Sequence, residues 1–385
     1  MPSNWNKIKS SILHLKDISI LSSASILANI IGGLFWMYMA SLMGPNEYGQ
    51  ISYFISIAVI VSAISLFGAN NSLIVFVAKG EKIQSLFFVI TITTSIVASI
   101  ILFSMFENFG MSLYAIGFVI FTLVLSDLLG RKLYLKYSKY LIIQRILMVC
   151  IAVPFYFIFQ TNGVLMGIAI SFLPFIFIIF KNFRQPINVT FMKSKIKVLL
   201  NIYLIDIITL TRGSLDKLII VPLLGFALLG NYQLGLQFIV ILNIIPIAIY
   251  QYILPQDSSG SSTIKLKILA VGISGLLAIT GAITAPFIVP ILFPEFNESI
   301  QITQILSFSI IPGTIAMMYK SKILGVEKPK FILIGSLIFV IVQIIAIFGL
   351  KDTYGIYGIA FAMILGLLSE ILFFGCISKF MFKKQ

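Results

Sequence analysis

Apolar residues fill almost the whole chain between residues 18 and 379, in stretches long enough to cross a membrane. A hydrocarbon core about 30 Å thick requires roughly 20 apolar residues in a helix. Mean hydropathy is +1.08 and only 10% of residues are charged, which excludes a water-soluble core of this size. The pattern predicts an all-α integral membrane protein with about twelve transmembrane helices, at residues 18–43, 50–78, 84–106, 110–129, 139–159, 162–180, 198–221, 224–253, 265–291, 299–319, 331–350 and 355–378.

Positive charge is concentrated in alternate connections between these stretches. Of the 27 Lys and Arg residues, 23 fall in the terminal segments or in connections on the same side as the N-terminus. Cytoplasmic loops carry such an excess, so the pattern predicts a multi-pass protein of the cytoplasmic (inner) cell membrane with both termini in the cytoplasm. The net charge of +14 is then a topology signal and a means of contact with anionic membrane lipids, not evidence for a nucleic-acid partner.

The basic segment at 181–197 divides the chain into an N-terminal lobe, 1–180, and a C-terminal lobe, 198–385, with six helices each. The halves also share glycines at a constant offset of 181 residues: Gly32 and Gly213, Gly44 and Gly225, Gly49 and Gly230. The coincidence favours an internal duplication. Because each half has an even number of helices, the repeats are parallel and related by a pseudo-two-fold axis along the membrane normal.

Ionisable residues inside spans are costly and usually mark a cavity or a functional site. Six residues qualify: Arg145, Asp206, Arg212, Asp216, Lys217 and Glu370. All of them except Arg145 and Glu370 lie in the expected span 198–221. On a continuous helix Arg212 and Asp216 share a largely polar face at spacing i, i+4. They either form a structural ion pair, with Lys217 extending outwards, or Arg212 and Lys217 hold an anionic group of a substrate, with Asp216 beside them.

The other polar positions within spans leave similar alternatives open. Arg145 is expected to extend towards lipid headgroups. Glu370 is a candidate for proton coupling, although it could instead have a structural partner, and Asp206 is a second coupling candidate. Asn70 and Asn71 could hydrogen-bond a sugar or simply a neighbouring helix.

Enzymatic machinery is not apparent in the sequence. There is one His, the expected loops are short, and no phosphate-binding loop of the Gly-x4-Gly-Lys-Ser/Thr type occurs. Cys150 and Cys376 lie in spans of different halves, so neither a disulfide nor a thiolate metal site is expected. The sequence therefore predicts a transporter with no catalytic residues, no cofactor and no metal site.

Several short motifs resemble the polysaccharide-flippase branch of the multidrug/oligosaccharidyl-lipid/polysaccharide exporter superfamily. The first half contributes the Gly44-Pro-Asn-Glu-Tyr-Gly49 turn and Phe67-Gly68-Ala69. The second half contributes Arg212-x3-Asp216-Lys217, Gly225-x4-Gly230-Asn-Tyr232, Pro255 and the basic turn at 322–330. The resemblance covers essentially the whole chain.

This resemblance implies two helical lobes that open to alternate sides of the membrane. The implied cargo is an oligosaccharide linked through pyrophosphate to a polyprenol, flipped from the cytoplasmic to the outer leaflet for surface polysaccharide biosynthesis. Arg212 and Lys217 are the positions implied to contact the head group; contact with other polysaccharide assembly proteins is left open. The first half has few basic residues within its spans, with Ile31 and Trp36 at the equivalents of these two positions.

Two other functions remain as alternatives. A multidrug or cation exporter of the same superfamily would use acidic cavity residues, for which Asp206 and Glu370 are available. An integral-membrane glycan polymerase or ligase would need a large outer loop with catalytic residues, and the expected outer connections are only a few residues long.

Overall fold

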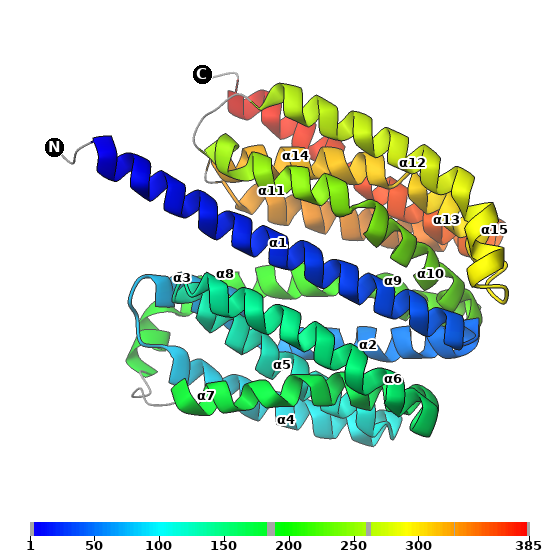
Figure 1. Cartoon of the computed structure of the whole chain (residues 1–385), viewed down its shortest axis with the longest axis horizontal. Coiled ribbons are helices and arrows are strands. Elements are labelled where there is room, and N and C mark those ends of the chain that lie inside the picture. The colour runs from blue at the N-terminus through cyan, green and yellow to red at the C-terminus, as the bar shows by residue number, and fades with distance from the viewer. Residues whose placement is uncertain (1–3, 183–188, 259–262, 327, 383–385) are drawn as a thin grey trace. The chain divides into compact units, whose positions relative to one another are not determined.

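A computed structural model describes residues 4–182, 189–258, 263–326 and 328–382, and this part of the chain is helical with no strand (Figure 1). The predicted all-α membrane fold is confirmed. The chain separates into two compact units: unit 1 contains Met1–Gly32 and Phe54–Thr211, and unit 2 contains Gly33–Tyr53 and Arg212–Gln385. The three boundaries therefore fall within the first helix, α1 (Asn4–Leu42), within α2 (Pro45–Ser65) and directly after α8 (Val189–Thr211).

Unit 1 is organised around α5 (Phe109–Gly130), which is buried along most of its length. Small residues allow close helix packing in a membrane, where apolar side chains gain little by leaving lipid. Gly110 and Gly117 of α5 accordingly lie against α6. The other helical elements of unit 1, besides parts of α1 and α2 (Pro45–Ser65), are α3 (Ala69–Ala78), α4 (Gln84–Phe106), α6 (Tyr134–Phe172), the 3₁₀ turn Leu173–Phe175, α7 (Ile176–Asn182) and α8.

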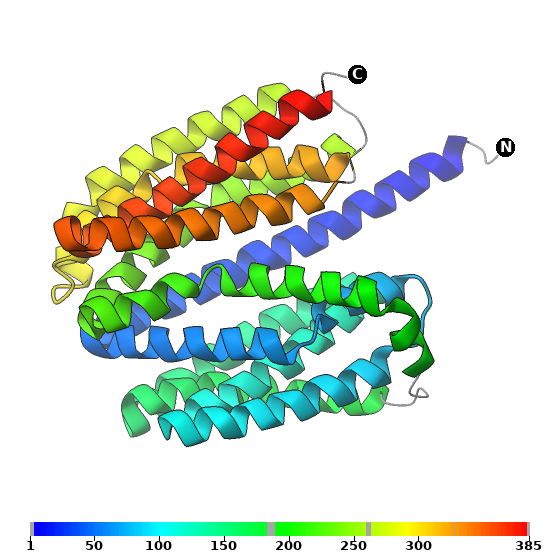
Figure 2. The same ribbon diagram turned by 180° about the vertical axis from the view of Figure 1, so that it is seen from behind.

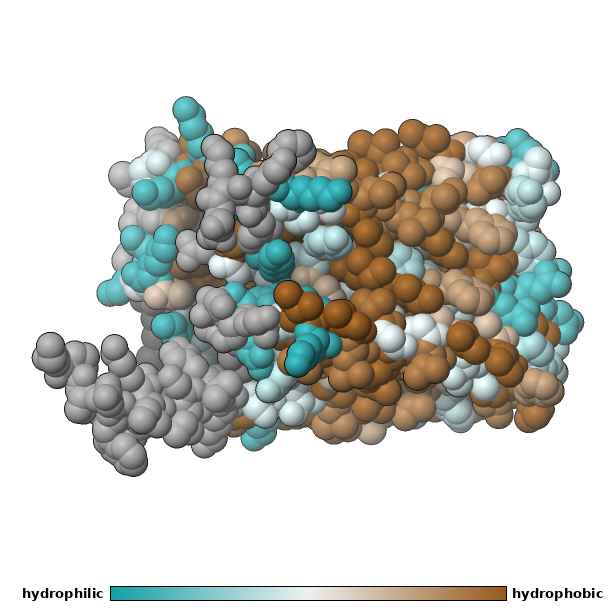
Figure 3. Space-filling view, turned by 90° about the horizontal axis from the view of Figure 1, so that it is seen from above, coloured by the Kyte–Doolittle hydropathy of each residue, from teal (hydrophilic) through white to brown (hydrophobic). Residues whose placement is uncertain are grey.

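Unit 2 has a core in which α10 (Phe226–Leu242) packs against α13 (Ser299–Ser307), with Tyr232, Ile302 and Leu306 fully buried. Its remaining helices are α9 (Leu215–Leu224), α11 (Ile244–Ser258), α12 (Ile264–Leu292), α14 (Ile310–Gly325) and α15 (Lys330–Phe382). On α12 a row of large apolar side chains is exposed, including Ile268, Leu276 and Ile291. On the face shown in Figure 3 a hydrophobic band lies between hydrophilic ends, as expected for contact with lipid.

The number of spans agrees with the twelve predicted. Eight helical stretches are long and apolar enough to cross a membrane, and two bent helix pairs raise this number to ten. Two of the stretches, Tyr134–Phe180 and Lys330–Lys379, have 47 and 50 residues, roughly 70–75 Å of helix, which is more than twice the hydrocarbon thickness. Each contains a residue with positive φ, Gln160 at 52° and Gly355 at 55°.

At these two residues the chain reverses. A Cβ atom on Gly163 would lie 2.0 Å from the carbonyl oxygen of Phe155, which requires the segments before and after Gln160 to run side by side. Beyond Gly355, Gly366 likewise lies against Phe339, and Figure 2 shows the two arms of α15 next to each other. Each long stretch is therefore a helical hairpin with two spans, which brings the total to twelve.

Four spans expected to be continuous are broken. The breaks lie at residues 66–68, 212–214, 243 and 308–309. At the first break Phe67 and Gly68 have φ values of 48° and 73°, which an α-helix cannot accommodate. Two of the breaks contain polar residues, Arg212 and Asn243, but the apolar stretches on either side of each break together have the length of one span, so the pattern that identified the spans did not locate the breaks.

The paired glycines at offset 181 make a reciprocal contact inside unit 2. A Cβ on Gly49 would lie 1.9 Å from the carbonyl oxygen of Phe226, and a Cβ on Gly230 would lie 1.9 Å from that of Pro45. Pro45 and Phe226 are themselves 181 residues apart. The start of α2 and the start of α10 thus pack against each other in the same way from both sides, as two copies of one repeat would.

Candidate functional site

Arg212 lies in the three-residue turn between α8 and α9. The sequence predicted one continuous helix across 198–221, and this prediction is wrong at Arg212, Gly213 and Ser214. Asp216 lies in the first turn of α9, where a carboxylate is favourable because the helix N-terminus carries partial positive charge. The break removes the i, i+4 geometry that would have paired Arg212 with Asp216.

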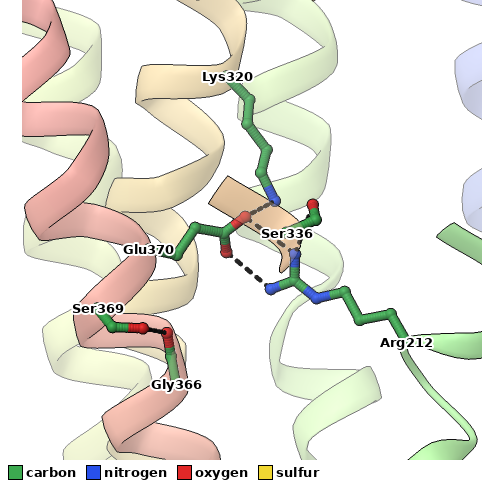
Figure 4. A network of polar contacts seen from close by, with 6 residues as sticks. All are labelled: Arg212, Lys320, Ser336, Gly366, Ser369 and Glu370. Atoms are coloured by element: carbon green, nitrogen blue, oxygen red, sulfur yellow. Dashed lines mark hydrogen bonds and ion pairs between the residues drawn. The ribbon is translucent and has the colours of Figure 1, made fainter. Parts of the chain in front are cut away.

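The partner of Arg212 is Glu370 of α15 (Figure 4). The guanidinium donates two parallel hydrogen bonds to the carboxylate, from Nη1 to Oε1 at 2.9 Å and from Nη2 to Oε2 at 2.7 Å. Lys320 of α14 places its Nζ 2.9 Å from the same Oε1. Ser336 accepts a further hydrogen bond from Nη1 at 3.1 Å, and the guanidinium carbon lies 3.7 Å from the centroid of the Phe339 ring.

We call Arg212, Lys320 and Glu370 the Arg212 cluster. Its two cations and one carboxylate carry a net charge of +1. The Glu370 side chain is completely buried, whereas those of Arg212 and Lys320 are 19% and 24% exposed. The positive groups are therefore the accessible part of the cluster, and an anionic group that approached it would meet their remaining donors.

Lys217 and Asp216 form a separate group in unit 2. The Lys217 Nζ lies 3.6 Å from Asp216 Oδ1 and also donates to the carbonyl oxygen of Gly213. The other carboxylate oxygen accepts a hydrogen bond from the Tyr232 hydroxyl at 3.0 Å. Both charged side chains are buried and their charges balance, so this pair resembles the structural ion pair considered in the sequence, with Lys217 in place of Arg212.

In unit 1 the structure brings Asp206 together with Asn71, at the start of α3. The Asp206 carboxylate accepts the backbone N–H of Asn71 at 3.2 Å and also its side-chain amide. Asn71 is the third residue of α3, so Asp206 caps a helix whose own N-cap residue, Gly68, offers no side chain. The neighbouring Asn70 accepts a hydrogen bond from Ser126 at 2.8 Å. These contacts link α3, the second half of the span that is broken at residues 66–68, to α8 and α5.

A further polar group joins three helices near the basic turn at 322–330. Asp257 at the end of α11 lies 2.6 Å from Lys267 Nζ of α12 and accepts a hydrogen bond from Ser321 of α14 at 2.6 Å. Burial would raise the pKa of Asp257, but the hydrogen bonds from Lys267, Ser321 and Thr263 outweigh it and lower the pKa below its ordinary value. At neutral pH this carboxylate is a charged link between the three helices.

Sequence reasoning missed Lys320, Ser336 and Phe339. Lys320 was assigned to a basic connection because the apolar stretch ends at residue 319, whereas α14 continues to Gly325 and carries Lys320 within it. Ser336 and Phe339 could have been identified only from the contact between their helix and Arg212. No local pattern in the sequence reveals that contact. Within the described ranges, no group of three or more His, Cys, Asp or Glu side chains could hold a metal ion.

No family model and no curated protein matches the sequence. Solved structures do match across almost the whole chain. The lipid II flippase MurJ in an inward closed conformation has a TM-score of 0.78 at 13% identity, covering 93% of this chain and 87% of its own. An inward-facing MATE-family multidrug resistance transporter of the MOP superfamily has a TM-score of 0.70 at 13% identity, covering 93% of this chain and 95% of its own.

A third match is a MOP superfamily transporter from Pyrococcus furiosus, described as having a binding pocket of reverse polarity that suggests a different function. Its TM-score is 0.61 at 12% identity, with 94% of this chain and 96% of its own covered. At these identities the likeness concerns the fold. The chain has the fold of MOP superfamily transporters, which includes both a flippase and multidrug transporters.

Proposed function

We propose that this protein is a membrane transporter that flips a polyprenyl-pyrophosphate-linked oligosaccharide from the cytoplasmic to the outer leaflet by alternating access, for surface polysaccharide biosynthesis. The observation that carries the proposal is the net positive Arg212 cluster, placed within the helices of a MOP-type fold. An arginine fork matches the geometry of phosphate oxygens and stays charged at any physiological pH.

The charge of the site is what separates functions within this fold, because the fold itself is common to several transport activities. Two accessible cations around one buried carboxylate favour an anionic head group over a cationic drug. Glu370 holds Arg212 and Lys320 close together, so a pyrophosphate could contact both without the protein first having to overcome their repulsion.

A cation exporter of the same superfamily remains a second candidate, on one observation. Asp206 is 1% exposed and, among the described side chains, has no Lys or Arg within ion-pair distance. Its contacts are neutral groups of Asn71. A buried carboxylate without a positive partner is the feature that a cation- or proton-dependent mechanism requires.

A glycan polymerase or ligase receives no support from the connections between helices. At the side assigned to the exterior, the longest connection is the six-residue segment 293–298 between α12 and α13. The others are one or two residues long, at 43–44, 107–108, 160, 225 and 355.

The test is a sidedness measurement in reconstituted vesicles. A polyprenyl-pyrophosphate oligosaccharide with a fluorescent sugar is incorporated, and a membrane-impermeant quencher reports the fraction exposed outside. We expect the wild-type protein to make the whole pool accessible to the quencher, whereas protein-free vesicles retain a protected half. If the protected half persists while the same vesicles transport a fluorescent cation, the protein is an exporter and not a flippase.

A further inference from the structure

The break between α2 and α3 leaves aromatic and polar side chains accessible within unit 1. Phe67 is 43% exposed, and Asn70, Asn71 and Tyr203 are half-buried. All four belong to unit 1. Phe67 has a φ of 48°, which is strained for a bulky side chain, yet much of its ring is not used for packing. Accessible polar groups within a span are costly and usually serve a function.

The main-chain groups at the break are already occupied by the protein. The carbonyl oxygen of Ile64 accepts a hydrogen bond from the Tyr203 hydroxyl at 3.1 Å. The N–H of Asn71 donates to the Asp206 carboxylate at 3.2 Å. A ligand at this place would therefore be recognised by side chains and not by free backbone groups.

Asn70 and Asn71 are each oriented by one half of the side-chain amide. The Asn70 Oδ1 accepts a hydrogen bond from Ser126 at 2.8 Å, which leaves its Nδ2 donor without a partner among the described residues. The Asn71 Nδ2 donates to Asp206, which leaves its Oδ1 acceptor without one. Consecutive residues thus offer one donor and one acceptor, and a sugar hydroxyl can act as both acceptor and donor.

An aromatic pair lies beside these amides. The rings of Phe67 and Tyr203 are stacked, with centroids 5.2 Å apart and planes 1° apart. Tyr203 and Asp206 are spaced i, i+3 on α8, which places their Cβ atoms about 5–6 Å apart. Since Asp206 holds Asn71, the aromatic pair and the Asn71 amide meet the same turn of α8. A pyranose has an apolar face of C–H groups and a rim of hydroxyls, which suits an aromatic ring next to oriented amides.

We propose that Phe67, Asn70, Asn71 and Tyr203 form a sugar-binding subsite on unit 1 that takes a pyranose residue of the cargo glycan. This inference rests on the proposed function and adds to it the recognition of the sugar. The subsite is uncharged, so it selects hydroxyl groups and a ring face, whereas the Arg212 cluster suits an anion.

The other two residues in contact with the asparagines have a positioning role. Asp206 and Ser126 each bind one half of an amide and leave the other half free. Neither is required to contact the sugar itself.

The experiment measures binding of free tetrasaccharides to the purified full-length protein in lipid nanodiscs, by titration with saturation-transfer NMR. The probes are tetrasaccharides of glucose, of galactose and of N-acetylglucosamine. Sorbitol is the control ligand, because it has hydroxyl groups but no pyranose ring. None of the probes carries a phosphate, so the Arg212 cluster is not required for binding.

The variants separate sugar contact from helix packing. Asn70→Leu removes both the free donor and the bond to α5, whereas Ser126→Ala removes the same bond and keeps the amide. Phe67→Leu removes the exposed aromatic ring. Phe103→Leu is its matched control, since Phe103 is a 48% exposed phenylalanine on α4 of the same unit.

We expect wild type to bind at least one tetrasaccharide more tightly than sorbitol. Asn70→Leu should weaken tetrasaccharide binding about 3- to 10-fold, the loss of one neutral hydrogen bond. Ser126→Ala should lower the melting temperature as Asn70→Leu does but weaken binding less. Phe67→Leu should also weaken binding, and Phe103→Leu should leave it unchanged.

Other outcomes overturn the inference or the proposed function. If Asn70→Leu, Ser126→Ala and Phe67→Leu all bind tetrasaccharides as wild type does, these residues are structural and the inference is wrong. Equal binding of sorbitol and of every tetrasaccharide to wild type would also refute it. The vesicle assay decides the proposed function separately: if the protected half of the lipid-linked glycan persists although tetrasaccharides bind as expected, the flippase function fails and the sugar site remains.

Discussion

At the scale of single residues, the decisive fact is which carboxylate each cation meets. Arg212 and Lys320 share Glu370, Lys217 is matched by Asp216, and Arg145 is unmatched among the described side chains. A charge that is neutralised inside the protein contributes mainly to structure, whereas an excess or unpaired charge is available to a ligand. The Arg212 cluster contains both kinds of charge.

Substitution of Arg212 separates these roles. Arg212→Ala should reduce flipping in the vesicle assay about 10- to 100-fold, and Arg212→Lys should retain part of the activity because the charge remains without the fork. If Arg212 were only a structural partner, the double variant Arg212→Ala with Glu370→Ala would regain wild-type flipping and abundance. Recovery of flipping in that double variant would contradict the role in cargo binding.

Glu370 is expected to act as the common partner of two cations. Glu370→Gln removes the negative charge and leaves Arg212 and Lys320 close together in a low-dielectric setting, so the melting temperature should fall by several degrees. Adding Lys320→Met should restore most of the lost melting temperature, as measured by thermal unfolding in detergent. A coupling role predicts instead that Glu370→Gln alone abolishes gradient-dependent transport at unchanged stability.

At the scale of helices, breaks and close contacts set the geometry. The span containing α2 and α3 is interrupted at Gly68, and the second half is held through Asp206 and the stacked rings of Phe67 and Tyr203, whose centroids lie 5.2 Å apart. Discontinuous helices are frequent where membrane transporters bind cargo or change conformation. The contacts that fix a break therefore decide how that helix can move.

Asp206 should behave as a helix cap. Asp206→Ala removes the acceptor for the Asn71 N–H and should destabilise unit 1 by about 0.5–2 kcal/mol, with faster hydrogen exchange at the start of α3. Asp206→Asn keeps an acceptor oxygen and should be close to wild type. Asp352→Ala, at an exposed carboxylate, is the control. If Asp206→Asn folds normally but loses transport, the carboxyl group has a coupling role instead.

The reciprocal glycine contact gives a sharper prediction about helix packing. Gly49→Ala or Gly230→Ala would drive a Cβ into a carbonyl oxygen at 1.9 Å, so each should greatly reduce the amount of folded protein in the membrane. Gly272→Ala is the matched control, because a Cβ on that helical glycine would meet nothing within 4 Å. Fluorescence-detected size-exclusion chromatography measures the folded fraction. Normal folding of both alanine variants would refute the close contact.

At the scale of the whole molecule, twelve spans and the distribution of positive charge predict how the chain lies in the membrane. Lys and Arg in short loops determine orientation because they are retained on the cytoplasmic side during insertion. The segment 181–197, of which 183–188 lie outside the described residues, is predicted to be cytoplasmic, and the connection 293–298 external. The two six-helix lobes and their pseudo-two-fold axis likewise remain predictions.

Cysteine labelling tests the orientation. Cys150 and Cys376 are first replaced by Ser, since both are exposed in the structure and would react. Single cysteines are then introduced at Lys195 and at Glu295 and treated with a membrane-impermeant maleimide in intact cells. We expect labelling at position 295 and, only after permeabilisation, at position 195. The reverse pattern would place both termini outside.

The sequence alone determined the class of this protein and the number of its spans. Each depends on local composition, since the free energy of placing a helix in hydrocarbon is close to a sum over its own residues. The same local information identified the costly residues inside spans, including Arg145, Asp206, Arg212 and Glu370.

Only the tertiary structure decided what those residues contact. Arg212 and Glu370 are 158 residues apart, and their pairing depends on a break in one helix and on the second arm of the α15 hairpin. Lys320 pairs with Glu370 because α14 extends past its apolar stretch. Arg145 differs from the other described arginines because no described carboxylate lies within ion-pair distance of it. A charge is visible in a sequence, but whether it is neutralised depends on distances of 3–4 Å between helices, which hydropathy and spacing do not encode.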